Sequence, residues 1–265
     1  MCSSDLGQRE PGASEAPGYE GSMQAIEILS HELRSPITTI HLGTKVLREG
    51  GHRISRPVRA EVVEAVEEEA ERLFRLVEDL LAVARHDHGA VPLPVGPLLL
   101  QHWLPPVIAA EVQASPALNV RASIPADLPP VLVDDGALAQ VIRNLLGNAV
   151  RYAPQGMPLE IVAWPDDPAT VRLEVLDRGP GIDPSEAARL FEPFYRSSAA
   201  RAMGSAAGLG LAAAQRLLQA MGADIQALPR QGGGARFVVH LPVALPEDGP
   251  LDEDLVPGGR EPEAP

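Results

Sequence analysis

The stretch VEAVEEEAERLFRLVEDLLAVA, residues 63–84, carries a clear helical pattern. Its apolar residues recur at alternating steps of three and four, at positions 63, 66, 70, 73, 77, 80 and 84. This spacing places them on one face of a helix and is typical of a coiled-coil seam. The glutamates between residues 61 and 71 are therefore expected to form the solvated side of the same helix.

A second amphipathic helix is predicted immediately upstream. Apolar residues or threonine occupy positions 26, 29, 33, 37, 40, 44 and 47, and Gly50 and Gly51 then stop the pattern. Two long helices joined by a short connection predict an antiparallel hairpin. Because a lone hairpin buries only one stripe per helix, we expect it to pair with a second copy into a four-helix bundle, most simply as a homodimer.

After the hairpin the pattern changes to mixed α/β. Gly89 and the Pro-rich residues 91–94 predict a linker. Short strands are predicted at 119–124, 159–163, 171–176 and 236–241, and helices at 138–150 and 209–221. This set favours an α/β sandwich with helices on one side of a mixed sheet.

The two ends of the chain are expected to lie outside the folded parts. Residues 1–22 and 246–265 are predicted to be disordered, the second as an acidic tail. Residues 2–6, CSSDL, match the translation of a common sequencing-adapter end, so an artefactual or truncated N-terminus is one hypothesis for the first segment. The helical hairpin then occupies residues 23–90 and the α/β domain residues 91–245.

Charge and composition exclude several classes of function. The 265 residues carry 22 basic and 36 acidic side chains, a formal net charge of −14, which argues against a nucleic-acid-binding surface. Residues 1–22 contribute −3 and residues 246–265 contribute −6, which leaves −5 for the rest. Cys2 is the single cysteine, so an intrachain disulfide and a cysteine zinc site are excluded.

No apolar run in the sequence reaches the roughly 18 to 20 residues that span a bilayer, so no membrane segment is predicted. The sequence as given is therefore interpreted as cytoplasmic. Tethering to the inner face of a membrane is the alternative if upstream sequence is missing.

The heptapeptide SHELRSP, residues 30–36, places a histidine on the solvent side of the first helix. Leu29 and Leu33 belong to the apolar stripe, and each residue turns the helix by about 100°, so His31 lies about 200° from either. Beside Glu32, an exposed imidazole can titrate and act as a nucleophile. An ordinary surface histidine is the alternative interpretation.

Three segments of the α/β half contain residues suited to a nucleotide. NLLGNAVRY, residues 144–152, places Asn144 and Asn148 on one helical face, and amide oxygens are suited to Mg²⁺. Asp177, which begins DRGPG, can accept a hydrogen bond from an adenine amino group. GLGL, residues 208–211, opens a helix whose free N–H groups suit phosphates. Each segment alone could also be an ordinary helix face or turn.

With the aromatic segment LFEPFY, residues 190–195, these motifs resemble the histidine kinases of bacterial two-component systems over about residues 24–242. The hairpin is similar to their dimerisation and histidine phosphotransfer domain, and residues 91–245 to their Bergerat-type ATP-binding domain. The resemblance implies that the catalytic residues are His31, Glu32, Ser35 and Asn144. It also implies ATP and Mg²⁺ as cofactors, with Asn148 as the Mg²⁺ ligand and a nucleotide site made of Asn144, Asn148, Arg151, Tyr152, Asp177, Gly179, Gly181, Phe191, Phe194, Gly208, Leu209, Gly210 and Leu211.

The reaction implied by this resemblance is autophosphorylation of His31 by ATP, followed by transfer to an aspartate of a response-regulator receiver domain. Glu32 would accept a hydrogen bond from the histidine Nδ1–H, and Ser35 keeps the hydroxyl that positions water for dephosphorylating the partner. Ala206 and Ala207 stand where the family usually has Gly followed by Thr or Ser. This departure favours, as the alternative, a catalytically weak nucleotide-binding scaffold of the same fold. A gyrase-like or chaperone-like ATPase would leave the His31 segment and the hairpin unexplained.

Overall fold

The computed structural model describes residues 17–50, 54–87, 92–115, 118–154, 156–202 and 207–248. Several features expected from the sequence lie outside these ranges: the N-terminal segment up to residue 16, Gly51, linker residues 88–91, Ala206 and the acidic tail from residue 249.

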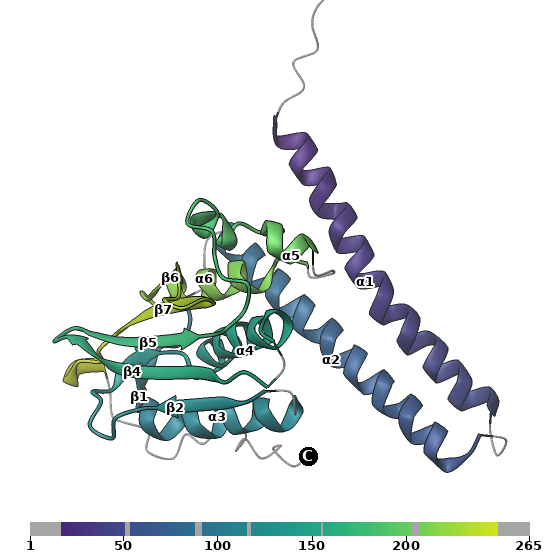
Figure 1. Cartoon of the computed structure of the whole chain (residues 1–265), viewed down its shortest axis with the longest axis horizontal. Coiled ribbons are helices and arrows are strands. Elements are labelled where there is room, and N and C mark those ends of the chain that lie inside the picture. Colours follow the sequence, from purple (N-terminus) through teal and green to yellow (C-terminus); the bar gives the residue numbers. More distant parts are fainter. Residues whose placement is uncertain are drawn as a thin grey trace, which may run out of the picture.

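Two long helices form the predicted hairpin. Helices α1 (Pro17–Gly50) and α2 (Arg56–Asp87) pack along one another and project from one side of the α/β domain (Figure 1). Residues 17–22 were expected to be disordered, but they are helical: α1 begins at residue 17 and not at residue 23. Proline is favoured at the first position of a helix, and extending an existing helix is easier than nucleating one.

Within one hairpin, only part of each predicted apolar stripe is covered. In α2, Val66, Leu73 and Leu80 are half-buried, whereas Val63 and Val77 are 38% and 42% exposed. Phe74 is 62% exposed and, with positions 70, 77 and 81, follows steps of four and three along one side of α2. The same division holds in α1, where the exposed members are Ile26, Ile37 and Thr44 and the half-buried ones are Leu29, Leu33, Ile40 and Leu47. A single hairpin therefore leaves an apolar face uncovered.

A five-stranded mixed sheet forms the centre of the α/β domain, with strand order β2-β4-β5-β7-β6. Its strands are β2 (Val120–Ser123), β4 (Leu159–Asp167), β5 (Thr170–Leu176), β6 (Asp224–Pro229) and β7 (Ala235–Pro242). Strands β2 and β4 are parallel, and the other neighbouring pairs are antiparallel. A separate antiparallel pair consists of β1 (Gly96–Leu98) and β3 (Val131–Val133).

The longer helices of this domain are α3 (Leu100–Ala114), α4 (Asp135–Tyr152) and α6 (Gly210–Ala220). The shorter ones are η2 (Ala187–Phe191), α5 (Ser198–Ala202) and η3 (Pro246–Asp248).

One face of the sheet is apolar and the other is charged. Ile161, Leu173 and Val239 come from three adjacent strands and are fully buried in the common core with the helices. The opposite face carries Glu174 between two arginines, with Arg236 3.1 Å and Arg172 4.0 Å away. Because side chains alternate along a strand, this division confirms the prediction of helices on one side of a mixed sheet.

Candidate active site

An open cavity of about 220 Å³ is lined by the last turn of α4, the segment after β5, α5, the first turn of α6 and strand β7. Five residues singled out from the sequence line it: Asn148, Tyr152, Asp177, Gly181 and Leu211. Pro180 and Leu190, which also line it, lie within the segments DRGPG and LFEPFY. The other lining residues were not identified from the sequence, namely Ile182, Asp183, Glu186, Ser197, Ser198, Ala199, Ala200, Ala235 and Phe237. The cavity therefore joins motifs that are far apart in the chain.

Asp177 is the buried carboxylate of this cavity. It directly follows β5 and is only 6% exposed. Its Oδ1 accepts hydrogen bonds from two backbone N–H groups, that of Gly179 at 2.7 Å and that of Ala235 at 2.9 Å. Among the described residues, no hydrogen bond is made to its second oxygen, Oδ2. Asp177 can thus offer one fixed acceptor to a ligand.

The two asparagines of α4 have different surroundings, although they lie one turn apart. Asn148 is half-buried and lines the cavity. Asn144 is not among the lining residues, and its Nδ2 donates to Asp79 Oδ1 of α2 at 2.9 Å and to the Gly210 carbonyl at 3.0 Å. Arg151, also predicted to bind the nucleotide, is exposed and does not line the cavity.

The aromatic segment and the second glycine segment hold each other. The Phe194 N–H donates to the Gly208 carbonyl at 2.9 Å, and both residues have positive φ, +65° and +70°. At Gly208 a β-carbon would lie 2.6 Å from the Tyr195 carbonyl oxygen, so only glycine fits there. Phe191 of the aromatic segment and Leu209 of the glycine segment are buried in the core, 7% and 1% exposed.

Glu186 joins two segments at the rim of the cavity. It accepts hydrogen bonds from the Tyr195 hydroxyl at 2.9 Å and from the backbone N–H of Ser198 at 3.1 Å. The Tyr195 hydroxyl holds the pKa of the Glu186 carboxyl below its usual range. Desolvation and the Glu186 carboxylate together raise the pKa of Tyr195. Glu186 is therefore a fixed anion beside the cavity, and no motif in the sequence indicated it.

On the hairpin, the predicted phosphoacceptor segment presents His31 to solvent. His31 and Ser35 are both exposed and lie one turn apart on α1. Glu32 is 8% exposed, and its Oε2 accepts from Arg72 Nη2 of α2 at 3.2 Å. His31 is not among the residues lining the cavity, so the two parts of the predicted site are separate in this conformation.

The donor set of the cavity fits a Mg²⁺ ion that arrives with phosphates. In the described ranges, no three His, Cys, Asp or Glu side chains are arranged to hold a metal ion by themselves. Asn148 places an amide group at the cavity. Mg²⁺ at nucleotide sites usually takes few protein ligands and fills its shell with phosphate oxygens and water, so Asn148 is the residue that would hold it here.

Comparison with known proteins assigns both halves of the chain. Residues 23–89 match the His Kinase A (phospho-acceptor) domain family, and residues 133–245 match the histidine kinase-, DNA gyrase B- and HSP90-like ATPase family. The chain is 34% identical over 253 residues to sensor histidine kinase Hik2 of Thermosynechococcus vestitus, a match that covers 89% of this chain and 64% of Hik2. This chain belongs to the bacterial sensor histidine kinases.

Solved histidine kinases share its two-part fold. The structure of AdeS from Acinetobacter baumannii superposes with a TM-score of 0.60 at 25% identity and covers 81% of this chain and 98% of that one. Full-length ShkA in complex with AMPPNP superposes with a TM-score of 0.58 at 29% identity, over 84% of this chain and 46% of that one. The chain spans only 24%, 64% and 45% of the first three curated relatives. In the part of this kinase that the structure describes, we find no helix long and apolar enough to cross a membrane.

In this histidine kinase, α2 also supplies a carboxylate to the ATPase domain. Asp79 is 9% exposed, and its Oδ1 accepts from Gln140 Nε2 at 3.0 Å as well as from Asn144 Nδ2. Burial raises the pKa of the Asp79 carboxyl, and the two amide donors only partly oppose this effect. The contact therefore joins the hairpin to α4, but it requires burial of the Asp79 carboxylate, which lowers the stability of the fold.

We expect Asp79→Asn to increase the free energy of unfolding at pH 7. The amide keeps an oxygen that can accept from Asn144 but carries no charge to desolvate. The pKa of Asp79 is raised in the folded state, so its carboxyl costs no stability below the unfolded-state pKa of about 3.9. The destabilisation grows as the pH rises from there to the folded-state pKa, and it is fully present above the folded-state pKa. The advantage of the variant should therefore shrink as the pH falls toward about 4.

Urea denaturation at several pH values measures this difference. The matched control is Glu78→Gln, which removes the neighbouring carboxylate of α2 and its ion pair with Arg143, 3.7 Å away. This control is expected to give no gain in stability. A variant Asp79→Asn that is less stable than the wild type at pH 7 would contradict the prediction.

Proposed function

We propose that this chain uses ATP to phosphorylate its own His31 and passes the phosphoryl group to an aspartate of a response-regulator receiver domain. The observation that carries this proposal is the presence, in one chain, of an exposed histidine on a helical hairpin and of a cavity with a fixed carboxylate, Asp177. The AMPPNP complex of its relative ShkA supports ATP as the nucleotide. We place the reaction in the cytoplasm, where ATP is available.

Adenine would bind at Asp177 and the phosphates near the start of α6. Oδ2 of Asp177 is the acceptor for the adenine amino group, since Oδ1 already accepts two backbone N–H groups. Leu211, in the first turn of α6, lines the cavity, and the free N–H groups at a helix N-terminus favour anions. Asn148 would hold Mg²⁺, which neutralises phosphate charge when bound.

The chemical step uses His31 as the nucleophile. The Nε2 lone pair of neutral His31 forms the bond to the γ-phosphorus while the bond to the bridging oxygen of ADP breaks. The imidazolium then loses its Nδ1 proton, and Glu32 is the proposed acceptor. Arg72 acts as a positioning residue, because its ion pair fixes the Glu32 carboxylate. Since His31 does not line the cavity, the ATPase domain must move relative to the hairpin before this step.

A nucleotide-binding scaffold without phosphotransfer is the alternative function. Ala207 is buried and offers no hydroxyl to a phosphate at the second glycine segment. The two functions differ in one outcome, because a scaffold binds ATP without labelling its own histidine.

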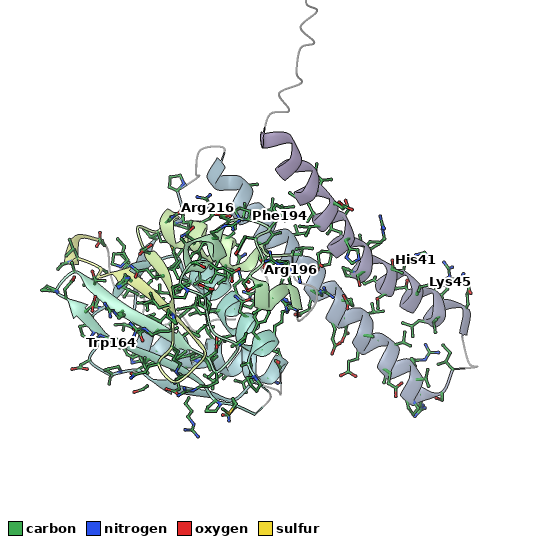
Figure 2. All side chains as sticks on the ribbon, turned by 45° about the horizontal axis from the view of Figure 1, so that its top comes forward. His41, Lys45, Trp164, Phe194, Arg196 and Arg216 are labelled. Atoms are coloured by element: carbon green, nitrogen blue, oxygen red, sulfur yellow. The ribbon has the colours of Figure 1, made fainter. Side chains whose placement is uncertain are left out.

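We expect His31→Gln to abolish incorporation of label from γ-labelled ATP and Mg²⁺, because glutamine has no nucleophilic ring nitrogen. His41 provides the matched control, since it is exposed on the same helix and labelled there in Figure 2, yet lies in no motif. The variant His41→Gln should retain wild-type labelling. Label that survives in His31→Gln would overturn the site, and unlabelled wild type with measurable ATP binding would establish the scaffold.

The uncovered face of the hairpin supports a homodimer. Phe74, Val77 and Leu81 are 62%, 42% and 48% exposed on α2, and Ile26 and Ile37 are 62% and 51% exposed on α1. Exposed apolar patches of this kind mark interaction surfaces. A second hairpin packed on this face would complete a four-helix bundle around these side chains.

We therefore expect Phe74→Ser to raise the dimer dissociation constant by at least about tenfold, because a central aromatic side chain is a typical interface hot spot. Sedimentation equilibrium measures the shift from twice the chain mass toward 28.1 kDa. Leu245→Ser, which changes a residue 55% exposed outside the hairpin, is the control and should remain dimeric. A wild type that sediments as a monomer at all concentrations would exclude the homodimer.

Dephosphorylation of the receiver domain is a second proposed activity of the same surface. Ser35 is exposed one turn after His31, where its hydroxyl can reach a partner docked over the histidine. The hydroxyl would hold the attacking water in line with the partner's phosphoaspartate.

We expect Ser35→Ala to slow the loss of phosphate from a labelled receiver domain by on the order of a hundredfold, since the misplaced water reacts poorly. The control Ser30→Ala removes an exposed hydroxyl that precedes His31 and should leave this rate unchanged. Equal rates in wild type and Ser35→Ala would refute the role of the Ser35 hydroxyl.

A further inference from the structure

A nearly buried arginine binds the backbone of Asp177 from the turn between β6 and β7. The Arg230 Nη1 donates to the Asp177 carbonyl at 3.0 Å, and the arginine side chain is only 7% exposed. The other terminal nitrogen, Nη2, lies 2.6 Å from Glu160 Oε1 of β4. One guanidinium therefore connects three parts of the domain: the β6–β7 turn, the end of β5 and the start of β4.

The turn that carries Arg230 is pressed against Asp177. Gly234 has a φ of +104°, and a β-carbon at this position would collide with the Asp177 carbonyl. The Arg230 N–H donates to the Gly234 carbonyl at 3.0 Å, and the Gly233 N–H donates to the Arg230 carbonyl at 3.1 Å. The residue after this closed turn is Ala235, whose N–H donates to Asp177 Oδ1. The position of the turn thus sets the direction of the Asp177 carboxylate.

Burial of the Arg230 charge requires its partner. A guanidinium removed from water is strongly unfavourable unless a carboxylate and further acceptors satisfy it. Glu160 supplies the carboxylate and the Asp177 carbonyl supplies a second acceptor. Glu160 is opposite Leu176 in the β4–β5 pairing, and Leu176 directly precedes Asp177. The ion pair of Arg230 with Glu160 therefore forms beside the end of β5, next to the cavity.

We propose that Arg230 and Glu160 are positioning residues that give the cavity its preference for adenine. The proposal rests on the proposed function, in which Asp177 accepts the adenine amino group. By fixing the Asp177 backbone and the β6–β7 turn, the pair keeps Oδ1 on two backbone N–H groups and Oδ2 toward the ligand. An acceptor held there favours the 6-amino group of adenine and repels the 6-oxo group of hypoxanthine or guanine.

The test compares ADP with inosine diphosphate, which carries a 6-oxo group, by calorimetric titration of the full chain in Mg²⁺. We expect Arg230→Met to weaken ADP binding by about tenfold, as for loss of one hydrogen bond to a charged group, and to leave inosine diphosphate binding within about twofold. Glu160→Gln should shift the ADP preference in the same direction. Arg172→Met is the matched control, since Arg172 lies on β5 and pairs with Asp166 at 3.0 Å on the same sheet.

Equal weakening of both nucleotides in Arg230→Met, or no weakening of either, would overturn the proposal. A purely structural role would lower affinity for both ligands, whereas a positioning role changes their ratio. If Arg230→Met does not fold, Glu160→Gln decides, because its side chain is 38% exposed and the amide keeps an acceptor oxygen.

Asp177→Asn separates failure of this inference from failure of the proposed function. A preference for ADP that is lost in Asp177→Asn but kept in Arg230→Met and Glu160→Gln leaves the adenine assignment intact and overturns the role of the pair. A wild type that shows no preference for ADP overturns both.

Discussion

The antiparallel pairing of β5 with β7 fixes the Asp177 carboxylate, on which the proposed nucleotide binding depends. Leu176 pairs with Arg236, and the ladder continues into the next residues, where the Asp177 N–H donates to the Ala235 carbonyl at 2.9 Å. The Ala235 N–H then donates to the side chain of Asp177 and not to its backbone. The last hydrogen bond of the β5–β7 pairing is therefore made to the Asp177 carboxylate, and the sheet holds this group more rigidly than a free loop could.

The sequence predicted the main elements of the fold because their patterns are local. All four predicted strands and the helices α1, α2, α4 and α6 are present. Apolar residues that alternate in a strand, or recur every three or four positions in a helix, mark the buried face of that one element. Helix α3 was missed because Pro105 and Pro106 lie inside it, and proline normally ends a helix. Strands β1 and β3 have three residues each, too few to show a period. Strand β6 was missed because it begins with an aspartate and ends with a proline, two residue types that are uncommon within strands.

Residues at or near the cavity were predicted where a single motif contains them and missed where contacts between elements place them. Asp177, Asn148 and Tyr152 were found because their motifs have recognisable spacing, and all three line the cavity. Glu186 and Arg230 belong to no motif, and their importance comes from partners nine or more positions away in the chain. Pairings of this kind depend on strand register and turn geometry, which residue types alone do not specify.

Asn144 shows how one helix face connects the two domains. Asn144 and Asn148 are one turn apart on α4, yet the first donates to Asp79 of α2 and the second lines the cavity. In this conformation the side chain of Asn144, to which the resemblance gives a catalytic role, is held by Asp79 through its Nδ2. Because Asp79 belongs to the hairpin, an ATPase domain that moves toward His31 relative to this part of α2 gives up the bonds of Asp79 to Gln140 and Asn144. The domain movement that the proposed reaction requires would therefore also release the Asn144 amide toward the nucleotide.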